Sequence, residues 1–299
     1  MTTSNRLKGA VAATLATICW GTAIVMSKGA LEVMPSGALL VMQLVASTVV
    51  VWAVLLIRRT PRLPWRASVR IGLLGWLEPG FAYFFSLAGL ASTGAGVASL
   101  IQATEAFMIL GLTSVLLRQR LRQSAVLLGL TALAGVVIAS DIGLGGSGQH
   151  QSISGILLVL LGTFSAALYV TLSSRLVDDH DPLAMVGIQQ VFALVLAVGL
   201  GYGELRALDP STLSTKAITL IATSGVLQYS LAFWFYLVAM RHMSAKAAGM
   251  FLNLIPILAL IEAYLFLGET LRSGQWAGVV LVLGSIWVFA RVDTGSHDH

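Results

Sequence analysis

Long runs of apolar residues recur along the whole 299-residue chain and limit its fold more than any other feature. A helix that crosses the roughly 30 Å hydrocarbon core of a bilayer needs about 20 mostly apolar residues. Five such stretches lie in each half, and short connections containing Gly, Pro, Asp or Arg join them. The sequence therefore predicts an all-α integral membrane protein of ten transmembrane helices, at residues 8–30, 36–57, 67–90, 94–117, 124–140, 153–176, 182–201, 216–240, 244–267 and 274–290.

Charged residues make up only 10% of the chain, whereas soluble domains carry about 25%. This composition excludes an ordinary soluble protein, because only a bilayer surrounds so much apolar surface with apolar solvent. The net charge of +5 comes from basic residues between the apolar runs, which argues against a nucleic-acid partner. The single cysteine, Cys19, excludes an intramolecular disulfide, and the absence of CxxC or Cys/His clusters predicts no cofactor and no structural metal.

The basic residues also predict an orientation. Fourteen of the 18 Lys and Arg residues fall on the side of the N-terminus if the spans alternate in direction. Cytoplasmic loops of membrane proteins carry such an excess of positive charge. We therefore expect both termini in the cytoplasm and a multi-pass protein of a bacterial inner (plasma) membrane, with only four basic residues on the outer side: Lys28, Arg206, Lys216 and Arg272.

The two halves of the chain match each other weakly when they are displaced by about 146 residues at the start and about 150 later. Gly9 then falls on Gly155, and Phe85 falls on Phe235. Five spans are an odd number, so the second copy must be inverted in the membrane, an arrangement typical of secondary transporters. We expect a first repeat at 1–142, a linker at 143–153, a second repeat at 154–292 and a cytoplasmic tail at 293–299.

Three stretches carry a resemblance to a known family: CWGTAIVMSKGAL in the first span, AYFFSLAGLASTGAGVASLIQATEAF in the third and fourth, and NLIPILALIEAYLFLGETL in the ninth. They resemble the drug/metabolite transporter superfamily in its ten-helix EamA-type branch, and within it exporters of amino acids, including aromatic ones. The resemblance extends from Leu7 to Val292 and implies two inverted five-helix repeats around a central cavity. One departure is Ala106 opposite Pro256, from which we expect a fourth span that bends less than in relatives.

Ionisable side chains at bilayer depth cost about 2.5–3.5 kcal/mol or more each and are therefore candidates for function. Aromatic rings could contact an apolar or cationic part of a substrate, while amides and a glutamate bind its polar groups. A packing role stays open, since a buried glutamate can simply bond a neighbouring helix and aromatic residues often belong to interface belts. The candidates for substrate binding are Trp20, Glu78, Tyr83, Gln102, Glu105, Tyr169, Tyr229, Trp234 and Asn253.

The sequence contains no GxxxxGK[ST] loop for nucleotide phosphates, which argues against ATP-driven pumping by the chain itself. It also has no HExxH motif and no filter-like loop, so we do not expect an enzyme or a channel. We expect a secondary transporter that exports amino acids, aromatic and other neutral ones among them, and related small metabolites by alternating access. Glu78 or Glu105 could exchange a proton for substrate.

An alternative function is efflux of cationic drugs or other metabolites, which the sequence does not separate from amino-acid export. The expected partners are a small-molecule substrate and the lipid bilayer. No feature of the sequence fixes the oligomeric state, and a monomer is compatible with it.

Overall fold

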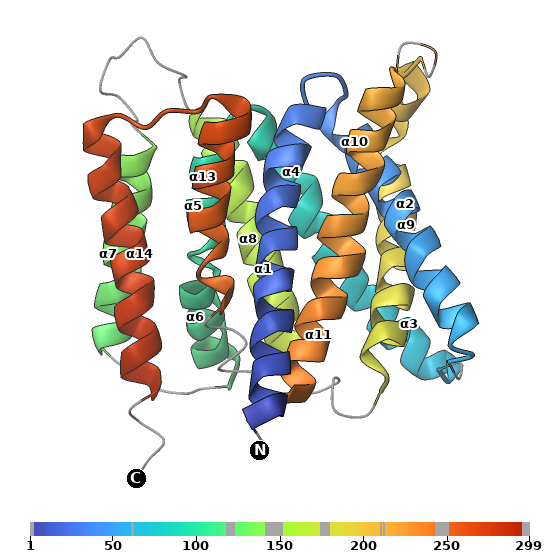
Figure 1. Cartoon of the computed structure of the whole chain (residues 1–299), viewed down its shortest axis with the longest axis horizontal. Helices are drawn as coiled ribbons and strands as arrows, with labels where there is room; N and C mark the ends of the chain where they lie inside the picture. The colour runs from blue at the N-terminus through green and yellow to red at the C-terminus, as the bar shows by residue number, and fades with distance from the viewer. Residues whose placement is uncertain are drawn as a thin grey trace.

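The computed structural model describes residues 3–60, 63–117, 123–140, 152–173, 180–209, 211, 213–242 and 251–294. Within this part of the chain all regular elements are helical (Figure 1). The first half contains α1 (Thr3–Ala30), α2 (Ser36–Ile57), α3 (Trp65–Gly75), the π-helical η1 (Trp76–Phe81), α4 (Ala82–Ala91), α5 (Ala95–Gln102), α6 (Glu105–Leu117) and α7 (Gln123–Ala139). The second half contains α8 (Ile153–Ser173), α9 (Pro182–Ala207), α10 (Thr215–Gly225), the π-helical η3 (Val226–Leu231), α11 (Ala232–His242), α13 (Ile255–Leu267) and α14 (Ser273–Thr294).

Seven helical stretches are long and apolar enough to cross a membrane, as judged by length and composition. Three further apolar helices are shorter: Gln123–Ala139, Ile255–Leu267 and Ser273–Phe289. Each of the ten predicted spans overlaps one of these stretches, and the number of crossings stays a prediction. The start of the predicted ninth span (residues 244–250) lies outside the described residues. Most of the predicted linker (residues 143–151) and most of the predicted tail (residues 295–299) lie outside the described residues.

The helices stand side by side, and both chain termini lie at the same end of the bundle (Figure 1). Helices from the two halves interleave in a reciprocal way, because α1 packs on α11 and α13 while α8 packs on α4 and α6. The helix α2 packs on α9, and α7 packs on α14 at one edge of the molecule. The largest cluster of buried apolar side chains includes Leu39, Leu44, Leu100 and Ile101 and joins helices of both halves.

Two long helical stretches are interrupted by π-helical turns, η1 and η3, whose first residues are 150 positions apart. In η1 the backbone of Glu78 leaves the helical region, with φ −144° and ψ 123°, and the Glu78–Pro79 peptide bond is cis. Because proline lacks an N–H group, Pro79 cannot continue the helical hydrogen bonds. The Leu77 carbonyl at this break instead accepts a hydrogen bond from the Ser165 hydroxyl on α8, at 2.9 Å.

The fourth predicted span is also interrupted, since α5 ends at Gln102 and α6 begins at Glu105. The span is thus broken even with Ala106 opposite Pro256, and the expectation that it bends less than in relatives stays a prediction. The Thr104 hydroxyl donates to the Ile101 carbonyl at 2.7 Å and offers the backbone an alternative to helical bonding. The ninth predicted span has a turn at 253–254, directly before α13.

Two glycines allow α2 and α9 to lie very close to the π-helical turns. Gly75 directly precedes η1, and a Cβ atom there would lie 2.7 Å from the Cα atom of Gln189 on α9. Gly225 directly precedes η3, and a Cβ atom there would lie 2.6 Å from the Cα atom of Gln43 on α2. Each contact brings a buried glutamine next to a place where the helix is broken.

Candidate substrate-binding site

Two small cavities lie inside the bundle, one on each side of Tyr229 in η3. Glu78, Tyr169, Gln189 and Phe233 line the first cavity together with Tyr229. The second cavity is lined by residues of α1, α4 and α5 with η3, among them Ser27, Tyr83, Ser86, Gln102, Gln228 and Tyr229.

The two cavities lie toward opposite ends of the bundle. Tyr169 near the end of α8 and Val186 near the start of α9 line the first cavity, so it lies toward the end that carries the chain termini. Leu90 near the end of α4 and Ala98 near the start of α5 line the second cavity, so it lies toward the other end. Tyr229, which is fully buried, borders both cavities.

A pair of tyrosines lies at the cavities: Tyr229 lines both, and Tyr83 lines the second. The Tyr83 ring on α4 contacts the Tyr229 ring edge to face, with centroids 4.7 Å apart. Trp20 on α1 extends this aromatic group, since its ring lies 5.2 Å from Phe233 and 5.7 Å from Tyr236 in edge contacts. Such pairs contribute about 0.5–1.5 kcal/mol beyond the apolar area that they bury.

Glu78 and Glu105 belong to different elements, yet their carboxyl groups are close enough to interact electrostatically. Tyr83 interacts with both of them, and its hydroxyl also lies near the side chains of Gln228 and Trp20. Glu105 is the first residue of α6, where the positive end of the helix dipole favours an acidic side chain. The fold therefore gathers two acidic groups around one tyrosine.

Buried amides complete the site. Gln190 joins three elements, because its Nε2 donates to the Tyr229 carbonyl at 2.8 Å and its Oε1 accepts from the Ser47 hydroxyl at 3.1 Å. Its neighbour Gln189 accepts a hydrogen bond at Oε1 from the Tyr169 hydroxyl at 3.2 Å. Both glutamines line the first cavity.

The structure brings most of the predicted site residues together. Five of them line the cavities: Glu78 and Tyr169 the first, Tyr83 and Gln102 the second, and Tyr229 both.

Four predicted residues are not among those that line the cavities. Trp20 and Glu105 are nevertheless linked to the same cluster through Tyr83. Trp234 lies under the guanidinium of Arg58, 5.5 Å from its ring centroid, and Asn253 lies in the turn before α13. A role in substrate binding stays a prediction for all nine residues.

Sequence reasoning missed Gln189 and Gln190 as parts of this site. Glutamine is uncharged and does not stand out in an apolar helix as a glutamate does. A usable signal was present, however, since displacement by 146 residues sets Gln43 on Gln189. In the described part of the chain, no three His, Cys, Asp or Glu side chains gather closely enough to hold a metal ion.

The EamA-like transporter family matches the chain over residues 7–140 and 153–291. The chain belongs to this family. An EamA-like protein with several helices able to span a bilayer is a multi-pass membrane transporter.

Relatives of this EamA-like chain include one named "Probable amino-acid metabolite efflux pump" in Salmonella typhimurium, 26% identical over 92% of both chains. A protein of the same name in Escherichia coli is 26% identical over 94% of both chains. An uncharacterized transporter of Archaeoglobus fulgidus is 25% identical over 77% of this chain and 80% of its own. A solved crystal structure matches all of both chains with a TM-score of 0.64 at 18% identity, which shows a similar fold.

Proposed function

We propose that this EamA-like transporter exports amino acids, aromatic and other neutral ones among them, and related small metabolites by alternating access. One observation carries the proposal: Glu78, which interacts electrostatically with Glu105, lines a cavity together with aromatic rings and amides, and a second cavity that shares Tyr229 lies toward the opposite end of the bundle. A zwitterion with an apolar side chain needs these three kinds of contact. An ammonium group would face a glutamate, and the side chain would pack among Trp20, Tyr83 and Phe233.

Alternating access requires two bodies that move around a shared site. The reciprocal packing of α1 and α8 on helices of the other half supports two inverted five-helix repeats, with ten transmembrane helices in all. The first repeat would comprise residues 1–142 and the second 154–292. The π-helical turns η1 and η3 occur at matching places in the two halves and border the site from both, which fits a hinge in each repeat.

The names of two relatives support amino acids as the substrate class. Both relatives are named as probable amino-acid metabolite efflux pumps, and this chain aligns with more than nine-tenths of each. The distribution of Lys and Arg supports an orientation with both termini in the cytoplasm. The relatives in Salmonella typhimurium and Escherichia coli support the bacterial inner membrane as the location. Export would then move substrate from the first cavity to the second.

The test is uptake into proteoliposomes that contain the purified full chain, with and without a pH gradient. The probes are radiolabelled L-phenylalanine, L-leucine, L-lysine and L-glutamate, together with the cationic dye ethidium. Saturable flux of the neutral amino acids supports the proposal, and its response to the gradient decides whether protons are coupled. Liposomes without protein are the control, and absence of all amino-acid flux overturns the proposal.

A second candidate function is efflux of cationic drugs. The observation that favours it is the pair of glutamates beside the rings of Trp20 and Tyr83, since such a site also attracts a flat organic cation. Flux of ethidium without flux of any amino acid would support this second function.

A further inference from the structure

Two neighbouring glutamines of α9 line the first cavity and differ in what their side chains bind. Both functional groups of Gln190 are engaged, the amide nitrogen by Tyr229 and the oxygen by Ser47. Gln189 is only 4% exposed, and its Nε2 has no hydrogen-bond partner among the described residues. Buried polar groups in native proteins nearly always have a partner, so this amide calls for one.

The equivalent position in the first half is different. Gln43, 146 residues earlier, donates from Nε2 to the Ser27 hydroxyl at 2.9 Å and to the Ser224 hydroxyl at 2.7 Å. The residue 150 positions before Ser224 is Leu74, which offers no side-chain acceptor. At the displacement of 146 residues Ser27 falls on Ser173, so the sequence keeps one of the two serine counterparts and lacks the other. In the structure the amide nitrogen of Gln43 is bonded, whereas that of Gln189 has no partner among the described residues.

The surroundings of Gln189 define what its partner can be. The cavity also contains Glu78, whose carboxyl group suits an ammonium, and the rings of Tyr229 and Phe233, which suit an apolar group. An amide N–H donates to an oxygen and needs an acceptor such as a carboxylate. A neutral donor also avoids the cost of a permanent positive charge at bilayer depth.

We infer that Gln189 recognises the carboxylate of a zwitterionic amino acid, with its Nε2 donating to a carboxylate oxygen while Glu78 faces the ammonium group. This inference rests on the proposed function and assigns the carboxylate-binding part of that site. It makes Gln189 a determinant of specificity, because an amine without a carboxylate gains nothing from the amide.

The test compares two probes that differ only in the carboxylate, L-phenylalanine and phenethylamine, in proteoliposomes containing the full chain. The variant Gln189→Leu removes the amide at similar volume. We expect its KM for phenylalanine to rise about tenfold or more, because a hydrogen bond to a charged group is lost. The KM for phenethylamine should change less than about twofold, which also shows that the variant is folded.

The variant Gln43→Leu is the matched control, since it removes a buried amide that the protein itself satisfies. It should lower the melting temperature of the purified protein more than Gln189→Leu does, because it leaves the hydroxyls of Ser27 and Ser224 without their donor. A larger loss of stability in Gln189→Leu would mean that this amide serves the fold, and would overturn the inference.

The transport outcomes separate this inference from the function on which it rests. If the wild type transports phenylalanine and Gln189→Leu leaves the ratio of the KM values for phenylalanine and phenethylamine unchanged, the inference alone is overturned. An equal rise in KM for both probes points to a structural role and also overturns it. Absence of all amino-acid flux in the wild type overturns the proposed function and, with it, this assignment.

Discussion

The Glu269 carboxylate, just beyond α13, accepts hydrogen bonds from the backbone N–H groups of Ala95 at 2.8 Å and Gly96 at 3.2 Å. These groups begin α5 and have no partner within their own helix. Glu204 near the end of α9 does the same for α2, accepting from Gly37 at 2.7 Å and Ala38 at 3.1 Å. Two glutamates of the second half thus hold helix N-termini of the first half, at the end of the bundle away from the chain termini.

These contacts predict that Glu269→Ala opens this end of the protein. Loss of the acidic cap should cost about 1 kcal/mol and shift the conformational equilibrium roughly fivefold. A cysteine introduced as Ala98→Cys in a Cys19→Ala background lines the second cavity and reports the opening through its rate of reaction with a membrane-impermeant maleimide. Glu269→Gln keeps an acceptor without the charge and should give a smaller increase. An unchanged rate in Glu269→Ala would contradict the prediction.

Aromatic preference should depend on the ring of Tyr83. Tyr83→Leu removes the edge contact with Tyr229, which has a centroid distance of 4.7 Å, and takes a ring from the second cavity. We expect the KM for phenylalanine to rise about 2- to 10-fold, while the KM for leucine changes little. Tyr83→Phe keeps the ring and should behave like the wild type toward both probes. Equal effects of Tyr83→Leu on both amino acids would argue against ring contact with the substrate.

Proton coupling, if present, should depend on an acid of the cluster around Tyr83. In Glu105→Gln we expect loss of flux driven by a pH gradient and retention of exchange between labelled and unlabelled phenylalanine, because the amide cannot bind or release a proton while Glu78 still faces the ammonium group. Glu78→Gln is the matched variant, and it should weaken both modes because it also removes the charge that faces the ammonium group. Measurement of both modes in the same proteoliposomes separates coupling from binding, and loss of both modes in Glu105→Gln, or of neither, would count against the prediction.

The positions of the long apolar helices and of the buried glutamates could be predicted from the sequence, because transfer between water and lipid changes the free energy of such groups strongly. An apolar run of about 20 residues favours a position inside the bilayer, and a glutamate within such a run is costly unless it has a function or a partner. Glu78 was found in this way, and the structure places it in the lining of the first cavity. The interruption between α5 and α6 was not foreseen, because a threonine hydroxyl and not a proline accompanies it.

Helical periodicity also says which residues share a face but not what that face meets. Trp234 was predicted as a candidate for substrate binding, and the structure sets its ring against Arg58 directly after α2. Gln189 and Gln190 are adjacent in sequence, and only their neighbours in space distinguish a glutamine that holds helices together from one with an unpartnered amide. Such differences depend on contacts between helices, and neither the composition of a helix nor the spacing of its residues predicts them.

The close contact of α9 with Gly75 predicts that this glycine cannot be replaced. In Gly75→Ala the added methyl group would overlap the backbone of Gln189, which cannot move away without shifting α9. We expect a loss of about 1–3 kcal/mol, seen as a lower melting temperature in detergent, and the same for Gly225→Ala beside Gln43. Gly111→Ala on α6 is the control, because apart from the adjacent residues and backbone of its own helix nothing lies within 4 Å of the added group. It should be neutral or stabilise by up to about 1 kcal/mol.

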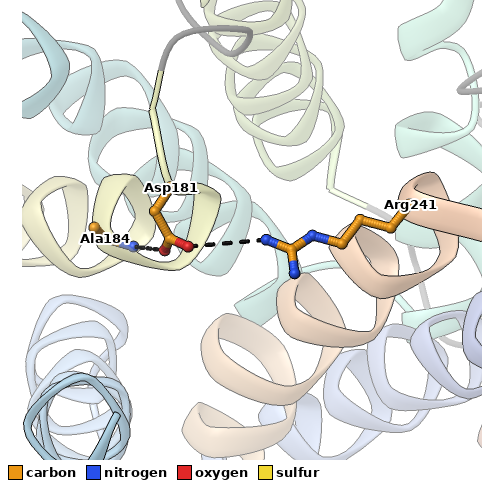
Figure 2. A network of polar contacts seen from close by, with 3 residues as sticks. All are labelled: Asp181, Ala184 and Arg241. Carbon is orange, nitrogen blue, oxygen red and sulfur yellow. Dashed lines mark hydrogen bonds and ion pairs between the residues drawn. The ribbon is translucent and has the colours of Figure 1, made fainter. Parts of the chain in front are cut away.

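Asp181 makes two contacts at the start of α9, and we expect them to contribute unequally to the stability of the protein (Figure 2). Its Oδ1 accepts a hydrogen bond from the Ala184 N–H at 3.0 Å, and its Oδ2 lies 3.8 Å from the Arg241 guanidinium at the end of α11. The cap satisfies an N–H group that has no partner inside the helix. The ion pair is open to solvent, with 65% of the arginine side chain and 39% of the aspartate side chain exposed.

We therefore predict that the cap matters more to stability than the ion pair. Asp181→Ala should cost about 1 kcal/mol and lower the melting temperature by about 2–4 °C. Arg241→Ala should cost less than about 1 kcal/mol, because an exposed pair is screened by water and salt. Asp181→Ser keeps a capping oxygen without the charge and should lie close to Arg241→Ala. If Asp181→Ser instead lowered the melting temperature as much as Asp181→Ala, the ion pair and not the cap would be the contact that stabilises this junction of α9 and α11.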